Sequence, residues 1–152
     1  MKLIDDAIKH STFVSATPEA VYDAIATTDG LNAWFCTGGE VDARPGGHIK
    51  FRWDDWRPDM GIIEDGGPVV EAERGKRFVF NWHPDSSEYA TNVEITFEPY
   101  KDGTILRVVE SGFQDTERGR RAMIGCATGW GEAFTLLKFY VEHGIIYWPD
   151  KK

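Results

Sequence analysis

The fold is decided by the stretch CATGWGEAFTLLKFYVEHG, residues 126–144, near the end of the chain. From residue 123 onward its apolar residues recur at steps of three and four, which places them along one face of a helix. The helix is expected to begin between Asp115 and Arg121 and to end at Gly144. A helix of that length can cross a whole sheet. The apolar stripe consists of Met123, Cys126, Ala127, Trp130, Phe134, Leu137 and Val141.

Two glycines, Gly129 and Gly131, flank Trp130 in the middle of this helix. Each costs about 1 kcal/mol of helix propensity relative to alanine. Such a cost is usually tied to a close approach of another backbone or to space that is kept open. The glycines therefore either leave a cavity beside the indole or only make room for the indole to pack against a strand. We favour the cavity.

The middle of the chain alternates between apolar and polar residues. This period of two predicts antiparallel strands with one buried and one solvated side. The alternating runs are HIKFRWD (48–54), KRFVFNWH (76–83), TNVEITFE (91–98) and GTILRVVESG (103–112). Turn signals separate them. These are RPGG (44–47), EDGGP (64–68), ERGK (73–76) and YKDG (100–103).

The N-terminal part predicts one strand and two short helices. Residues 5–16 form the strand, and Thr17 then caps a helix that has Pro18 in its first position. Gly30 is expected to end that helix, and LNAWF (31–35) forms a second short helix or turn. Residues 1–152 thus predict a single α+β domain. In it a curved antiparallel sheet wraps around the C-terminal helix, and the two short helices lie between the first and second strands.

Aromatic side chains from the predicted strands and from the helix converge on the space between them. A concave, mostly apolar space with a few polar groups is typical of a site for a small molecule. We therefore expect an apolar or aromatic ligand between the sheet and the C-terminal helix. The predicted ligand-binding residues are Trp34, Phe51, Trp53, Phe80, Trp82, Ile95, Phe97, Met123, Ala127, Trp130 and Phe134.

The composition excludes several classes of partner. A formal net charge of -8 argues against nucleic acids and anionic membrane surfaces, both of which attract clustered Lys and Arg. No segment is long and apolar enough for a membrane span, and the first residues lack the apolar run of a signal peptide. A cytoplasmic location is expected. Cys36 and Cys126 are interpreted as small apolar residues, and a disulfide between them is left open.

No metal or cofactor is expected. The four histidines form no metal-binding pattern, and His48 and His83 fall on the presumed outer side of their strands. The carboxylates of Asp54, Asp55 and Asp59 lack the spacing of a calcium loop. We interpret them as the solvated end of a hairpin.

No catalytic residue is assigned. The chain has neither a Gly-x-Ser-x-Gly motif nor a phosphate-binding glycine loop. Glu64, Glu110 and Arg107 lie on strands, and an inward carboxylate could act as an acid or base. For each of the three an outward, solvated position is favoured, since charged side chains are rarely buried. Whether the protein is an enzyme is left open, with binding favoured.

Five segments, taken in order, form a recognisable set. They are SATPEAVYDAIATTDGLNAWF (15–35), RPGGHIKFRW (44–53), RFVFNW (77–82), GTILRVVESGF (103–113) and GWGEAFTLLKFYVEHG (129–144). Together they resemble the family of homologues of the activator of the heat-shock chaperone ATPase, within the START-like, or SRPBCC, superfamily. The resemblance runs from about residue 8 to residue 144. It implies a helix-grip fold, and in the superfamily the space between sheet and helix holds lipids, sterols or polyketides.

The resemblance carries over no catalytic residue. Trp34, Gly46, Gly47, Trp82, Gly129 and Trp130 match the family's pattern. Eukaryotic relatives stimulate the ninety-kilodalton chaperone's ATPase with the help of an additional N-terminal domain, so the resemblance alone does not imply a co-chaperone role for residues 1–152.

Three hypotheses follow. The first is a binding protein for an apolar small molecule. The second is an enzyme of the polyketide cyclase or aromatase kind, using the same cavity with an acid or base such as Glu110 or Glu64. The third is a stress-related regulator of a chaperone ATPase that binds its partner through an outer surface. Either a monomer or a homodimer is compatible with the sequence.

Overall fold

The computed structural model describes residues 2–56 and 59–147. It contains ten helices and strands within these residues. In chain order they are β1 (Ile8–Val14), α1 (Pro18–Ala26), α2 (Thr28–Trp34), β2 (Glu40–Val41), β3 (His48–Asp54), β4 (Ile62–Glu73), β5 (Arg77–Trp82), β6 (Thr91–Tyr100), β7 (Gly103–Ser111) and α3 (Glu117–His143). The expected single domain 1–152 and the expected hairpin end at 54–59 both include positions outside the described residues.

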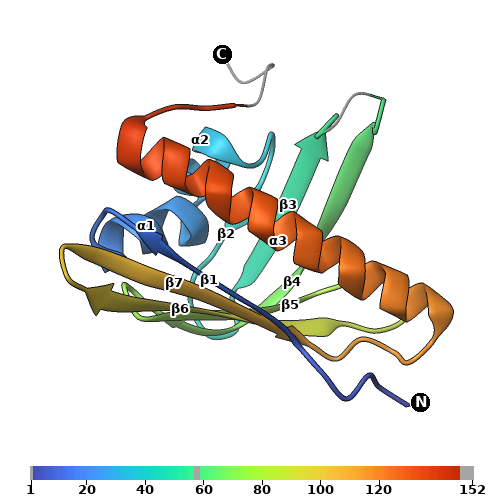
Figure 1. Cartoon of the computed structure of the whole chain (residues 1–152). Helices are drawn as coiled ribbons and strands as arrows, with labels where there is room; N and C mark the ends of the chain where they lie inside the picture. The colour runs from blue at the N-terminus through green and yellow to red at the C-terminus, as the bar shows by residue number, and fades with distance from the viewer. Residues whose placement is uncertain (1, 57–58, 148–152) are drawn as a thin grey trace.

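The strands form one seven-stranded antiparallel sheet in the order β1-β7-β6-β5-β4-β3-β2. The sheet curves, and α3 crosses its concave face from one end to the other (Figure 1). The helices α1 and α2 lie between β1 and β2 in sequence. The predicted α+β class and helix-grip fold are thereby confirmed. At one side of the sheet the β3–β4 hairpin stands up beside α3 (Figure 1).

The ends of the helices follow the predicted signals. The hydroxyl of Thr17 accepts a hydrogen bond from the N–H of Ala20 at 3.2 Å and caps α1. Thr116 caps α3 in the same way, through the N–H of Gly119 at 2.9 Å. Gly144 ends α3 with a φ of 68°, a left-handed conformation that glycine adopts without strain.

Gly30 does not end α1, as we had expected. The helix ends at Ala26, and Gly30 lies inside α2. A Cβ atom at position 30 would lie 1.9 Å from the backbone oxygen of Asp23. The glycine therefore permits the close contact of α1 and α2.

The EDGGP segment is not a turn either. Gly66 and Gly67 lie in the middle of β4, paired with Lys50 and Ile49 of β3. A Cβ atom at either glycine would lie 2.2 Å from a backbone oxygen of a neighbouring strand. These glycines permit the close approach of the neighbouring backbones. A register shift follows in β4 between Val69 and Glu71.

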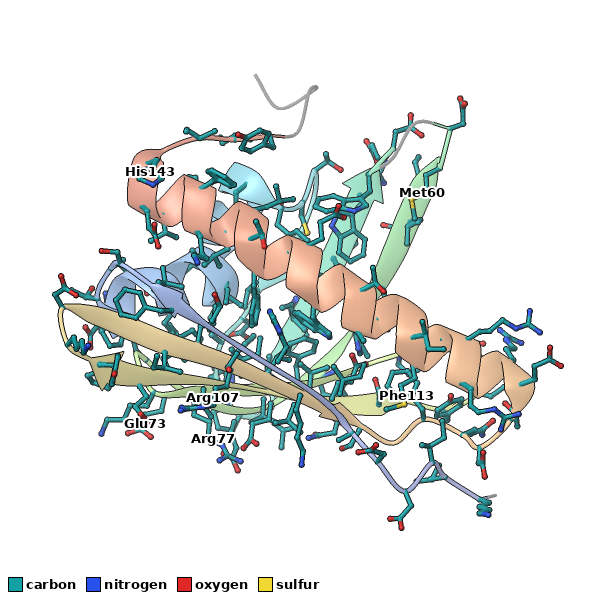
Figure 2. The ribbon with its side chains drawn as sticks, in the orientation of Figure 1. Met60, Glu73, Arg77, Arg107, Phe113 and His143 are labelled. Atoms are coloured by element: carbon teal, nitrogen blue, oxygen red, sulfur yellow. The ribbon has the colours of Figure 1, made fainter. Side chains whose placement is uncertain are left out.

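The two faces of the sheet differ as the alternation predicts. The inner face packs under α3 and consists of buried residues such as Phe51, Phe80 and Leu106. The outer face carries ion pairs, among them Arg107 with Glu98. Figure 2 shows Arg77 and Arg107 on the side of the sheet away from α3. Any ligand site of apolar character therefore belongs to the inner face.

Candidate functional site

A groove of about 330 Å³ opens between α3 and the β3–β4 hairpin. The hairpin and its neighbours supply large side chains to it, whereas α3 supplies mostly small ones. From α3 come Ala122, Gly125, Cys126, Gly129, Trp130 and Ala133. The opposite wall consists of Phe35, Trp53, Trp56, Met60, Ile63, Trp82 and Pro84.

The small residues of α3 leave space between the helix backbone and the opposite wall of the groove. Gly125 and Gly129 are one helical turn apart, so they lie on the same face of α3. A Cβ atom added at either position would meet nothing within 4 Å. Gly129 therefore borders open space, in agreement with the favoured interpretation of this glycine. Gly131 also borders open space, but it lies outside the groove lining.

The space between α3 and the centre of the sheet is filled. Only about 20 Å³ remain beneath Trp130, room for about one water molecule and far less than the several hundred Å³ of a small-molecule site. Phe51 and Phe80 pack there with ring centroids 5.6 Å apart, and Phe134 lies 5.8 Å from Trp130. Aromatic rings thus occupy the part of this space that faces the centre of the sheet. The open volume lies beside α3 instead.

The predicted ligand-binding residues fall into three groups. Trp53, Trp82 and Trp130 line the groove. The second group surrounds the small central remnant and consists of Trp34, Phe51, Phe80, Ile95 and Phe134 together with Trp130. The third group, Phe97, Met123 and Ala127, lines neither space.

Each member of the third group has a physical reason for its place. Phe97 packs on Tyr22 of α1, with ring centroids 5.3 Å apart. Met123 is half-buried against the core. Ala127 is exposed, because it lies about 100° further round the helix than Cys126, which faces the groove. The three- and four-residue spacing thus predicted a stripe broader than the face that packs.

Sequence reasoning missed several residues of the opposite wall. Phe35 follows Trp34 directly and stacks on it with centroids 4.6 Å apart, and it also meets Trp53 and Trp56 at 5.3 Å each. Met60 lies on the hairpin beside α3 (Figure 2). The run of aromatic residues at 51–56 was a signal for this wall. Which way these aromatic side chains point depends on the path of the β3–β4 hairpin, and the alternation of apolar and polar residues does not predict that path.

Glu110 is the main correction. An outward position was favoured, but its side chain is 0% exposed. The carboxylate accepts hydrogen bonds from Trp82 Nε1 at 2.7 Å, Trp130 Nε1 at 2.8 Å and Thr91 Oγ1 at 2.6 Å. The signal was present in the sequence, because Glu110 continues the inward alternation of Leu106 and Val108 on β7.

Glu64 and Arg107 lie as expected. The side chain of Glu64 is 48% exposed and contacts Lys50, and that of Arg107 is 45% exposed and pairs with Glu98. Neither belongs to the groove lining. A charged strand residue is therefore predicted better by its place in the alternation than by the general exposure of its residue type.

Glu110 holds two walls of the groove in place. Burial raises the pKa of its carboxyl, and the hydrogen bonds from Thr91, Trp130 and Trp82 act in the opposite direction. Its two indole partners lie 5.7 Å apart between ring centroids, tilted by 43°. Both indoles belong to the groove lining, whereas Glu110 does not. The carboxylate thus fixes the indoles from behind and does not itself face the open space.

Cys126 is a titratable side chain of the groove lining. Burial raises the pKa of its thiol well above the ordinary range, and the charges of Glu110, Asp65 and Asp85 add to the effect. The thiol is protonated at neutral pH, so it is a poor nucleophile. Cys126 and Cys36 form no disulfide with each other, which answers the question that the sequence left open.

Two further indoles supply polar atoms near the groove. Trp56 Nε1 donates to the Glu132 carboxylate at 3.1 Å, which links the β3–β4 hairpin to α3. Trp53 Nε1 is buried and has no hydrogen-bond partner among the described residues.

The described residues contain no group of three His, Cys, Asp or Glu side chains that could hold a metal ion. In the same part of the chain, none of the helices combines the length and the apolar character that crossing a membrane requires.

Comparisons with known proteins agree with this architecture. The family model for Activator of Hsp90 ATPase homolog 1-like protein matches residues 15–142. The Aha1 dimer from Colwellia psychrerythraea is 25% identical with a TM-score of 0.73, over 91% of this chain and 98% of that chain. Protein CV1439 from Chromobacterium violaceum is 26% identical with a TM-score of 0.74, over 91% of this chain and 99% of that chain.

A more distant structure shares the fold alone. CalU16 from Micromonospora echinospora is 19% identical with a TM-score of 0.69, over 91% of this chain and 77% of that chain. No match was found among curated proteins.

Proposed function

The chain belongs to the family of Activator of Hsp90 ATPase homolog 1-like proteins, and we propose that it is a small binding protein that holds an apolar or aromatic molecule in the groove beside α3. The single observation that carries the proposal is the groove itself. It has about 330 Å³ of open volume, within the range of small-molecule sites, and mostly apolar walls.

The glycines of α3 and the buried Glu110 support a role of the groove in binding. Glycine at positions 125 and 129 costs helix stability, although a Cβ atom would fit at both. Glu110 is buried at the expense of its hydration and orients two indoles of the wall. Both features reduce the stability of the fold, and a function of the groove would explain why they are present. A ligand that fills the groove would stabilise the folded protein and so offset this loss.

The cyclase or aromatase alternative lacks support from the described lining. That lining contains no carboxylate and no histidine, and its Cys126 thiol is protonated at neutral pH. Glu110, the residue suggested for acid or base chemistry, is separated from the groove by Trp82 and Trp130. We therefore prefer binding without catalysis.

The family favours one further candidate, the regulation of a chaperone ATPase through an outer surface. Its test is the ATPase rate of the cognate ninety-kilodalton chaperone with and without this protein. An unchanged rate would exclude it. The relative from Colwellia psychrerythraea forms a dimer, so a homodimer is the first assembly to test, by sedimentation.

We propose a cytoplasmic location, with which two cysteines that form no disulfide with each other are compatible.

The binding proposal can be tested by following the indole N–H signals in NMR spectra during titration with 4-tert-butylbenzyl alcohol, a compact apolar probe. The signals of Trp53, Trp56, Trp82 and Trp130 should shift, since these rings line the groove. The signal of Trp34 should stay in place, because its N–H donates to Ala24 O at 2.9 Å, away from the groove. Shifts confined to Trp34, or no shift at millimolar probe, would contradict the proposal.

A further inference from the structure

We propose that the preferred ligand class of the groove is an organic cation, an alkylated ammonium group carried on an apolar body. This inference rests on the proposed function, since it names the chemistry of the molecule that the groove would bind. It is argued from the aromatic wall and from the carboxylates behind it.

Five aromatic rings line the groove, and four of them are indoles. The face of an aromatic ring carries negative potential and attracts an ammonium group, and indole does so most strongly. Cages of such rings recognise quaternary ammonium groups, whose methyl groups need no hydrogen bonds. The described lining contains no Lys or Arg that would already occupy these ring faces.

Three of the four indoles donate their N–H to a carboxylate. Trp82 and Trp130 share Glu110, and Trp56 donates to Glu132. Hydrogen-bonded groups polarise one another, so a carboxylate at the N–H makes the ring more electron-rich. The arrangement also suits an ionised Glu110, because an indole N–H can donate but cannot accept.

Three carboxylates lie near the groove lining. Glu110, Asp65 and Asp85 all act on the thiol of Cys126, which lines the groove. Asp85 is paired with the exposed Arg118 at 3.0 Å. Asp65 instead accepts backbone N–H groups, from Gly66 at 2.7 Å and His83 at 2.9 Å. Charges that disfavour a thiolate at this place favour an ammonium ion there.

The decisive experiment compares three probes of the same ring and the same hydroxymethyl group. The para substituent is trimethylammonium, tert-butyl or sulfonate, which are close in size and differ in charge. Affinities are measured by calorimetry at pH 8 and fixed ionic strength. The cation should bind at least about five-fold more tightly than the neutral probe, as one desolvated cation–π contact provides. The sulfonate should bind most weakly.

The outcomes separate this inference from the proposed function. If the neutral probe binds and the cation binds no more tightly, the inference fails and the proposed function stands. If none of the three binds, both fail.

Two charge-neutralising variants locate the source of the preference. Glu132→Gln keeps an oxygen acceptor for Trp56 Nε1 but removes one charge at the groove. Glu98→Gln removes one charge on the outer face of the sheet, where Glu98 is 56% exposed. The ratio of cation to neutral affinity should fall about two- to three-fold in Glu132→Gln and stay unchanged in Glu98→Gln. A ratio that survives Glu132→Gln undiminished, or that falls equally in both variants, would overturn the inference.

Discussion

Replacing Gly129 by leucine should narrow the groove without weakening the fold. In a helix, a leucine side chain points back toward the preceding turn. From position 129 it would extend toward Gly125 and Cys126, both of which line the groove. Nothing within 4 Å of the added Cβ atom would oppose it.

The size of both effects follows from the structure. The four carbon atoms that leucine adds would project into the groove of about 330 Å³ and take up part of the volume that a ligand would fill. Glycine and leucine differ in helix propensity by about 0.8 kcal/mol in favour of leucine. For a chain of this size that gain raises the Tm by about 2–3 °C.

The assay pairs calorimetric titration of 4-tert-butylbenzyl alcohol with thermal unfolding followed by circular dichroism. Gly131→Leu is the matched control, because it lies two residues away, has the same open surroundings and is outside the groove lining. Gly129→Leu should lose at least about ten-fold in affinity, and Gly131→Leu should bind like the wild type. Equal affinity of a folded Gly129→Leu variant and the wild type would refute the reasoning. A marked loss of stability would show that α3 packs more tightly than the structure indicates.

Three other substitutions test the packing and the buried carboxylate. Gly30→Ala should destabilise by about 1–3 kcal/mol in urea unfolding, because its Cβ atom would lie 1.9 Å from Asp23 O; a gain would contradict the close contact of α1 and α2. Phe134→Ala should cost about 3–5 kcal/mol in the same assay, because Phe134 is only 2% exposed; a cost below 1 kcal/mol would mean that the centre is not filled. The pKa of Glu110 is raised by burial, so its contribution to stability is complete below its ordinary value of 4.5 and is lost as the pH rises through the folded-state pKa. The unfolding free energy of the wild type minus that of Glu110→Gln should therefore fall as the pH rises above 4.5, and a difference that rises with pH would speak against it.

Much of the fold could be predicted because local patterns and packing agree. The alternation of Ile49, Phe51 and Trp53 placed the inner face of β3 correctly, and the cap at Gly144 ended α3 where expected. Such signals act within a few residues and depend little on distant parts of the chain. The helix-grip architecture then follows from the need to bury both the apolar face of the sheet and the apolar stripe of the helix.

The site could be predicted only in part, because open volume depends on how side chains from distant segments fill space. Phe51, Phe80 and Phe134 were expected to contact the ligand, and the space that they surround measures only about 20 Å³. Phe35 and Trp56 form part of the groove through the course of a loop and a hairpin. No periodicity predicts that course.

Glu110 shows a different limit. Its place in the alternation predicted an inward side chain, whereas the general exposure of glutamate predicted an outward one. Whether such a carboxylate is buried depends on its hydrogen-bond donors, and those of Glu110 come from β5, β6 and α3. A buried carboxylate needs several donors, and only the folded chain brings Trp82, Thr91 and Trp130 together.

The most direct test of the central claim is a crystal structure of the protein soaked with 4-bromobenzyl alcohol, with the bromine located by its anomalous signal. The account predicts one strong bromine peak in the groove, in contact with Trp130 and Cys126 and between α3 and the β3–β4 hairpin. A peak elsewhere, such as in the hollow beside Lys138 and Phe139 near the end of α3, or no peak in crystals soaked at millimolar concentration, would contradict it.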